Sequence, residues 1–283
     1  MNTQGNGAVG LEMRVQGMNA PLRATLWRAT EKVDLLIVFL HGGNFVSEDS
    51  AELDNFFREL GGLPSLAILA PRYTLATESP FPTPLEDAVS VLQWTEKNKG
   101  RLGWTGAALI VAGIEAGANL AAAAALVNRD RRGARLAAQI LLMPMLDPAL
   151  GSRSMREADG DGHGGRSSAA HRCASGYQDY LPNVADRMHP YATPLYSSRL
   201  KDLPPTLIFS VDGDPLRDEG EAYGVKLIEQ GVRTSVVRLP AIALEARGAR
   251  GECASSRQVI GEISGFLNAL SSSSHPTTQR EPS

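Results

Sequence analysis

The feature that most constrains the fold of this chain is an apolar run that ends in a glycine-bounded turn. Residues 107–112 are small and apolar, which predicts a buried strand. Glycines stand at positions 113 and 117, and the alanine-rich run that continues to Leu126 predicts a helix. We therefore expect a strand, a tight turn and a helix, with the central residue of the turn exposed on a strained backbone. That residue is Glu115.

Composition and charge exclude several classes of protein. The 283 residues suffice for one large α/β domain or two small ones. A formal net charge of −3 gives no sign of a nucleic-acid partner. The N-terminal residues carry no signal-peptide pattern, and no apolar run approaches the roughly 20 residues of a membrane span. We expect a cytoplasmic protein with no membrane partner, in which Cys173 and Cys253 are unpaired thiols.

Predicted strands and helices alternate along most of the chain. Apolar runs predict strands, and segments of helical period lie between them. Strands are predicted at 22–28, 34–40, 66–70, 107–112, 139–143, 205–211 and 234–239, and helices at 51–60, 84–94, 116–126, 216–230 and 258–270. This alternation predicts an α/β fold with one mainly parallel, doubly wound sheet and helices on both faces. Ligands of such sheets bind at the carboxyl ends of the strands, where His41, Glu115 and Asp214 fall.

Less regular segments bound and interrupt the predicted domain, which spans residues 21–270. Residues 1–20 are expected to form a flexible N-terminal arm, and residues 271–283 a disordered tail. Residues 149–190 break the alternation and are expected to form a lid. We expect the histidines in or beside this lid to face solvent, unless one of them leans in as a proton carrier: His163, His171 and His189.

Several motifs, in the correct order, resemble the hormone-sensitive-lipase-like carboxylesterases of the α/β-hydrolase fold. Residues 41–45, His-Gly-Gly-Asn-Phe, are similar to the family's His-Gly-Gly-Gly oxyanion loop, with Asn44 in place of the last glycine. Residues 113–121 are similar to its Gly-x-Ser-x-Gly nucleophile elbow, and residues 214–220 to the segment that carries the catalytic acid. Residues 71–73 and 79–88 are similar to a further conserved stretch of that family. The resemblance covers about residues 22–270.

The resemblance implies an α/β-hydrolase fold with a lid, and a site with named parts. It implies an oxyanion hole formed by the N–H groups of Gly42, Gly43 and Ala116, in the loop that contains His41 and Asn44. His41 is expected to shape this loop through hydrogen bonds of its ring rather than to exchange protons. Tyr73 is expected to pack structurally.

Two departures from the family pattern bear directly on its chemistry. Glu115 stands at the position of the nucleophilic serine, and Leu244 stands where the catalytic histidine belongs. Of the catalytic triad only the acid, Asp214, is present. Serine-dependent acyl transfer needs a hydroxyl and a base that takes its proton, so ordinary esterase activity is not expected.

Glu115 has three interpretations. The favoured one makes it a general base beside the oxyanion hole, in a cofactor-free lyase or isomerase that acts on a carbonyl-containing small molecule. The second is an inactive hydrolase-like protein that binds a small molecule or a partner protein. The third is an atypical hydrolase with Glu115 as covalent nucleophile. A metal site at Glu115 and Asp214 is not expected because a third ligand is missing, and a homodimer is left open.

Without its histidine, Asp214 is expected to cap a loop or to pair with a nearby arginine such as Arg217. The small and basic residues 247–251 are expected to form a solvated loop.

Overall fold

Apolar runs build a central sheet in the computed structural model, which describes residues 7–48, 50–158, 169–241 and 249–273. The sheet has eight strands in the order β1-β2-β4-β3-β5-β6-β7-β8. β2 pairs antiparallel with both β1 and β4, and every other pair is parallel. The strands are β1 (Val9–Gln16), β2 (Pro21–Arg28), β3 (Val33–Leu40), β4 (Leu66–Pro71), β5 (Trp104–Ile114), β6 (Leu136–Leu142), β7 (Thr206–Val211) and β8 (Thr234–Leu239).

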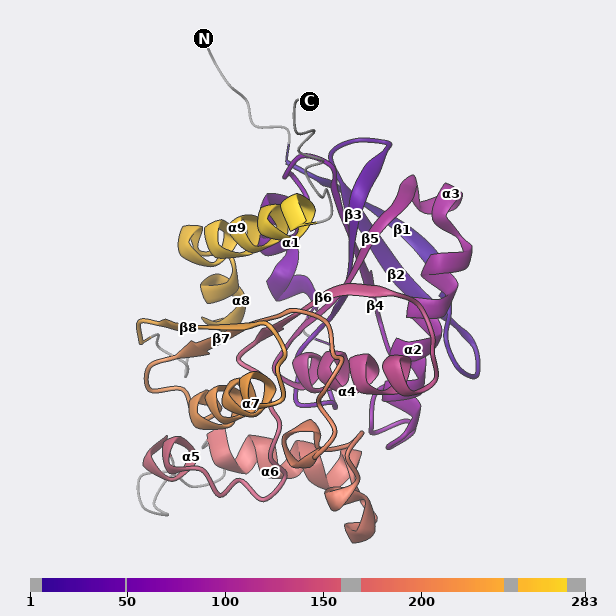
Figure 1. Cartoon of the computed structure of the whole chain (residues 1–283). Helices are drawn as coiled ribbons and strands as arrows, with labels where there is room; N and C mark the ends of the chain where they lie inside the picture. Colours follow the sequence, from indigo (N-terminus) through magenta and orange to yellow (C-terminus); the bar gives the residue numbers. More distant parts are fainter. Residues whose placement is uncertain (1–6, 49, 159–168, 242–248, 274–283) are drawn as a thin grey trace, which may run out of the picture.

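Helices cover both faces of the sheet (Figure 1). One layer contains α2 (Thr83–Lys97), α4 (Ala116–Asp130) and α7 (Arg217–Glu229), and the other contains α1 (Asp54–Leu60), α8 (Ala249–Ala254) and α9 (Arg257–Ser273). Strand β3 shows how the core is divided. Leu36 and Val38 pack toward the first layer, and Ile37 and Phe39 toward the second, as the alternation of a strand requires. The predicted α/β fold with a mainly parallel, doubly wound sheet is confirmed.

The predicted flexible arm at residues 1–20 is wrong for residues 9–16, which form strand β1. This strand pairs with β2 along its whole length, from Val9 opposite Arg28 to Gln16 opposite Pro21. β1 is an edge strand whose apolar residues Val9 and Leu11 are exposed, so its alternation carries little sign of burial. At the other end, α9 continues to Ser273, three residues into the predicted tail. Residues 1–6 and 274–283 lie outside the described residues.

The segment predicted as a lid, residues 149–190, contains more helix than its composition indicates. It includes α5 (Arg153–Ala158), α6 (Ala169–Tyr180) and the 3₁₀ helix η3 (Val184–Met188), while residues 159–168 lie outside the described part. In Figure 1 these elements lie beyond α4 and α7, on the side of the first helix layer. Shorter elements elsewhere are η1 (Ser50–Leu53), α3 (Lys99–Leu102) and η4 (Pro194–Tyr196).

Cys173 and Cys253 are both free and both buried, which confirms the prediction of unpaired thiols. Within the described ranges, no helix has the length and apolar character needed to cross a bilayer.

Candidate functional site

The predicted strand, turn and helix meet at Glu115. Strand β5 ends at Ile114 and α4 begins at Ala116, so Glu115 alone forms the apex, with φ 56° and ψ −116°. Both glycines of the turn are required by close backbone contacts. A Cβ on Gly113 would collide with the carbonyl oxygen of Gly117, and one on Gly117 would collide with that of Leu40. The backbone of this chain is therefore that of a nucleophile elbow, with a carboxylate at its tip.

The loop after β3 folds against this apex. Gly43 has φ 99°, and a Cβ there would collide with the carbonyl oxygen of Ser47. Asn44 and Phe45 also have positive φ, 51° and 66°. A Cβ on Gly42 would lie 2.9 Å from Oε2 of Glu115. The absence of a side chain at Gly42 is what lets the Glu115 carboxylate approach the loop.

The Glu115 carboxylate lies on the backbone of the oxyanion loop. The N–H of Gly43 donates a hydrogen bond to Oε2 of Glu115 at 3.3 Å, and Glu115 is only 8% exposed. Its main chain is fixed on both sides: its N–H donates to Leu142, and its carbonyl oxygen accepts from Met145. Ala116, the first residue of α4, is fully buried and follows Glu115 directly, although the Glu115 side chain makes no capping hydrogen bond to this helix. The structure thus brings Glu115, Gly42, Gly43 and Ala116 together.

His41 and Tyr73 support the loop. Their rings stack at 4.2 Å, and the Tyr73 hydroxyl donates to the carbonyl oxygen of His41 at 2.9 Å. Nδ1 of His41 lies 2.7 Å from the carbonyl oxygen of Gly42. These contacts are in line with the expected loop-shaping role of His41 and the packing role of Tyr73.

Asp214 follows β7 and is completely buried. It accepts the N–H of Leu216 at 2.9 Å, and Arg250 binds it through two nitrogens, at 2.5 and 3.1 Å. The expected pairing with an arginine is therefore present, but Arg217 is the wrong partner. Arg217 pairs instead with Asp218, its neighbour in the chain, at 2.9 Å.

Arg250 is the functional residue that the sequence interpretation missed. It lies on α8, so the expected solvated loop is wrong at residues 249–251, while residues 247 and 248 lie outside the described ranges. Its side chain is 21% exposed. Burial lowers the pKa of Arg250, but the charges of Asp214 and Glu115 outweigh that effect and hold the pKa above its usual range. The guanidinium is therefore a permanent cation that serves two carboxylates.

Helix α6 covers the oxyanion loop from the lid side. A Cβ on Gly176 would collide with the carbonyl oxygen of Asn44, and the ring of Tyr180 stacks on Phe45 at 4.0 Å. Cys173 of the same helix is buried, and burial together with the negative charge of Glu115 raises the pKa of its thiol well above the usual range. Cys173 is thus a neutral thiol near the site. No motif in the sequence indicated its position.

The structure describes only some of the remaining residues that the sequence singled out. Leu244 and His163 lie outside the described residues. His171 and His189 are exposed, as expected for histidines that face solvent. Glu219, at the start of α7, is a further buried carboxyl group: burial, reinforced by the charge of Asp147, raises its pKa well above the ordinary value.

Metal ligation finds no support among the residues that the structure describes. No group of three histidine, cysteine, aspartate or glutamate side chains lies there at a spacing that could hold an ion. The cation that the structure places on Asp214 is the guanidinium of Arg250.

Comparisons with known proteins identify the fold family of the chain. A family model described as the alpha/beta hydrolase fold matches residues 37–243. The arylesterase of Saccharolobus solfataricus is 31% identical over 235 residues, which cover 83% of this chain and 74% of that protein. The ethyl acetate hydrolase of Pseudomonas putida is 28% identical over 209 residues, 73% of this chain but 64% of its own length.

Solved esterase structures have the same architecture. An esterase of Pyrobaculum calidifontis superposes with a TM-score of 0.81 at 30% identity, over 94% of this chain and 86% of its own. A fungal esterase from Rhizomucor miehei reaches a TM-score of 0.84 at 25% identity, over 96% of this chain and 86% of its own.

Proposed function

Because the chain belongs to the α/β-hydrolase fold family, among carboxylesterase-like members, we propose that it uses their scaffold for proton transfer in place of ester hydrolysis. Two observations argue against the serine-dependent reaction. A carboxylate occupies the apex of the elbow, and the buried acid Asp214 is bound by Arg250. A serine hydrolase needs at these two points a hydroxyl and an imidazole.

The observation that carries the proposal is the position of the Glu115 carboxylate, 3.3 Å from the Gly43 nitrogen. A base at that position can reach a C–H bond next to a carbonyl whose oxygen enters the oxyanion loop. Glu115 removes the proton, the electron pair of the C–H bond moves onto the carbonyl oxygen, and an enolate forms. The N–H groups of Gly42, Gly43 and Ala116 stabilise that charge, as they would in a tetrahedral intermediate.

The fate of the enolate defines the reaction class. In an elimination, the electron pair returns to form a carbon–carbon double bond, and a carboxylate or hydroxide leaves from the adjacent carbon. The proton on Glu115 can neutralise that leaving group. In an isomerisation, Glu115 returns the proton at another carbon. Neither route requires a cofactor, and both use the carboxylate as the single proton carrier.

In the absence of substrate, the carboxylate itself occupies the Gly43 N–H. A substrate carbonyl must displace it, because one N–H cannot donate a strong hydrogen bond to both acceptors. The displaced oxygen then has a lone pair available for the substrate proton. Binding of the carbonyl and release of the base are thus one event.

A second candidate function is favoured by the Asp214–Arg250 pair. This bidentate pair leaves Asp214 without a titrating partner, as in a protein that binds a ligand and performs no reaction. The third interpretation, a covalent ester on Glu115, needs an activated water to release the product. The two lid histidines that the structure describes, His171 and His189, are exposed to solvent, which does not favour activation of a water inside the site.

One probe separates the three functions. Methyl 4-nitrophenylacetate has both an ester bond and an acidic C–H bond next to its carbonyl. In D2O, NMR follows deuterium exchange at carbon and release of methanol in the same sample. We expect exchange without hydrolysis in the wild-type protein. Glu115→Gln should slow the exchange by about 10²–10⁴-fold, the usual contribution of a general base, and should retain binding as judged by saturation transfer.

The control is Glu229→Gln, which removes an exposed carboxylate at the end of α7 and should leave exchange unchanged. Equal exchange rates in the wild-type and Glu115→Gln proteins would refute the base. Binding without exchange in the wild type would favour the ligand-binding function. Hydrolysis lost in Glu115→Ala would favour the covalent nucleophile, and hydrolysis that persists in it would indicate another nucleophile.

A further inference from the structure

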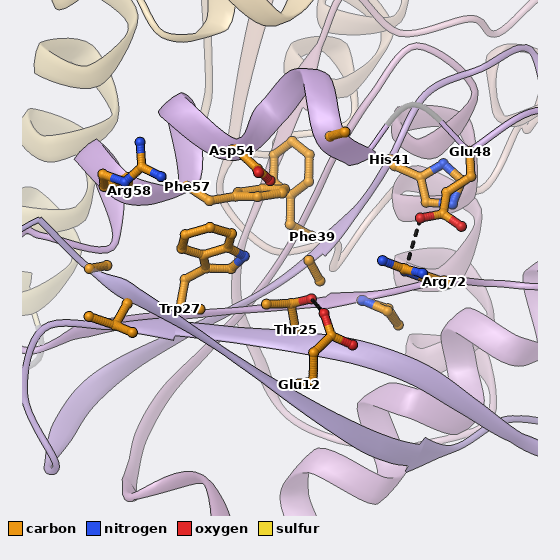
Figure 2. A pocket seen from close by; sticks show the side chains of 16 residues that line it. Glu12, Thr25, Trp27, Phe39, His41, Glu48, Asp54, Phe57, Arg58 and Arg72 are labelled. Carbon is orange, nitrogen blue, oxygen red and sulfur yellow. Dashed lines mark hydrogen bonds and ion pairs between the residues drawn. The ribbon is translucent and has the colours of Figure 1, made fainter.

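A cavity of about 540 Å³ lies between helix α1 and the sheet face formed by β1, β2 and β4 (Figure 2). Neither Glu115 nor Asp214 lines it, and the oxyanion loop contributes only His41. Its volume falls within the range of small-molecule sites, roughly 300–1,000 Å³. The cavity is therefore a candidate binding site separate from the elbow.

Trp27 presents a hydrogen-bond donor to this cavity. Gly10 lies opposite Trp27 in the β1–β2 pair, and a Cβ on Gly10 would be 3.1 Å from the indole, so the glycine leaves room for the ring. Trp27 is 8% exposed, and its Nε1–H donates to no residue that the structure describes. In Figure 2 the indole nitrogen points toward the middle of the pocket. This N–H is accessible from the cavity and has no partner among the described residues, which favours a ligand that brings an acceptor.

Carboxylates face the same space. Asp54 begins α1 and makes no hydrogen bond or ion pair with the described residues. Its carboxylate lies above the pocket in Figure 2, near the ring of Phe57. Glu12 accepts only the hydroxyl of Thr25, at 2.8 Å, which leaves its charge uncompensated.

The arginines that line the cavity do not balance these charges. Arg72 is already paired with Glu48 at 2.9 Å. Arg58 donates to Asn55 at 3.2 Å. The lining has three carboxylates and two guanidiniums. The Arg72–Glu48 pair neutralises one of each, which leaves the carboxylates of Glu12 and Asp54 and the guanidinium of Arg58. The remaining charge is negative and favours a cationic ligand.

Aromatic rings form the floor of the cavity. Phe39 and Phe57 meet edge to face at 5.2 Å, and Phe57 lies 6.0 Å from Trp27. Aromatic faces attract both flat rings and cations. We propose that this cavity binds a small protonated aromatic amine that carries an oxygen acceptor: its ammonium group binds Asp54, its ring lies against Trp27, and its oxygen accepts the Trp27 N–H.

Three related probes test each contact by isothermal titration calorimetry. Tyramine has the ammonium, the ring and a phenolic oxygen, phenethylamine lacks the oxygen, and 4-hydroxyphenethyl alcohol lacks the ammonium. We expect tyramine to bind the wild-type protein most tightly. Loss of the oxygen should weaken binding by up to about tenfold, as for one hydrogen bond, and loss of the ammonium by up to about fivefold, because the Asp54 carboxylate is exposed.

Variants assign those preferences to residues. Asp54→Asn should abolish the preference for tyramine over the alcohol. Glu59→Gln, which neutralises another exposed carboxylate of the same helix outside the cavity, should leave that preference intact. Trp27→Phe should keep the ring but abolish the preference for tyramine over phenethylamine. The comparison of probes on the wild-type protein does not depend on the folding of any variant.

Several results would overturn the proposal. These are equal affinity of tyramine and the alcohol for the wild type, absence of binding by all three probes, and an Asp54→Asn protein that behaves like Glu59→Gln. None of these variants changes Glu115 or Asp214. The outcome is therefore independent of the reaction proposed for the elbow.

Discussion

Replacement of Arg250 by methionine is the most informative perturbation of the site. Met has a similar length but no charge, so Arg250→Met leaves the carboxylate of Asp214, which is completely buried, without its cation. Breaking a buried ion pair from one side costs about 3–5 kcal/mol. Because a fifth of the Arg250 side chain is exposed, we expect the lower limit, about 3 kcal/mol of unfolding free energy.

Thermal and urea unfolding measure this loss. At about 2.1 cal/mol/K per residue, the 283 residues unfold with an entropy of about 0.6 kcal/mol/K, so Tm should fall by about 5 °C. The matched control is Arg131→Met. Arg131 binds Glu86 with the same bidentate geometry, at 2.6 and 2.7 Å, but its side chain is 49% exposed. That exposed pair should contribute less than about 1 kcal/mol.

A double variant completes the cycle. Asp214→Asn combined with Arg250→Met removes both charges and keeps an acceptor for the Leu216 N–H. We expect the double variant to regain most of the lost stability, because Asp214 no longer carries a buried charge, while Glu115 keeps its hydrogen bond from Gly43. The reasoning is refuted if Arg250→Met loses no more stability than the Arg131 control. It is also refuted if the double variant is as unstable as Arg250→Met alone.

Three shorter predictions concern the elbow and the buried groups around it. Burial and the charge of Asp147 raise the pKa of Glu219, so the native state binds its proton more tightly than the unfolded state does. The free energy of unfolding should therefore fall as pH rises above about 4.3, and Glu219→Gln should remove that fall. Urea titrations at several pH values measure it, and the same pH dependence in the wild type and the variant would contradict this prediction. Gly117→Ala should lower the unfolding free energy by about 1–3 kcal/mol in urea, since its Cβ meets the carbonyl oxygen of Leu40, and an unchanged midpoint would argue against that collision. Glu115→Ser should not hydrolyse p-nitrophenyl acetate above background, because the acid remains bound to arginine; strong turnover would reveal a base.

The elbow could be predicted from sequence because its constraints are local. A buried strand, two glycines and a helix lie within some twenty consecutive residues, and the Cβ contacts at Gly113 and Gly117 explain why both are glycine. The proximity of Glu115 to the oxyanion loop followed from the resemblance to carboxylesterases. Neither inference required knowledge of a distant side chain.

The partner of Asp214 could not be predicted in the same way. Arg250 lies 36 residues away in the chain, on a helix of six residues whose composition favours a loop. Arg217 is nearer to Asp214 in the sequence, but its guanidinium pairs with its neighbour Asp218 instead. Strand β1 was missed for a related reason: its stability comes from pairing with β2 rather than from burial of its own residues.

The choice of arginine at Asp214 has a consequence for any chemistry at this site. A histidine paired with a buried carboxylate exchanges protons near neutral pH, whereas a guanidinium stays charged throughout that range. The Asp214–Arg250 pair can therefore orient and neutralise, but it cannot carry a proton. Cys173 is held as a neutral thiol by burial and by the charge of Glu115. Under the proposed function, Glu115 carries the proton, and this is why its replacement by glutamine decides between a reaction and mere binding.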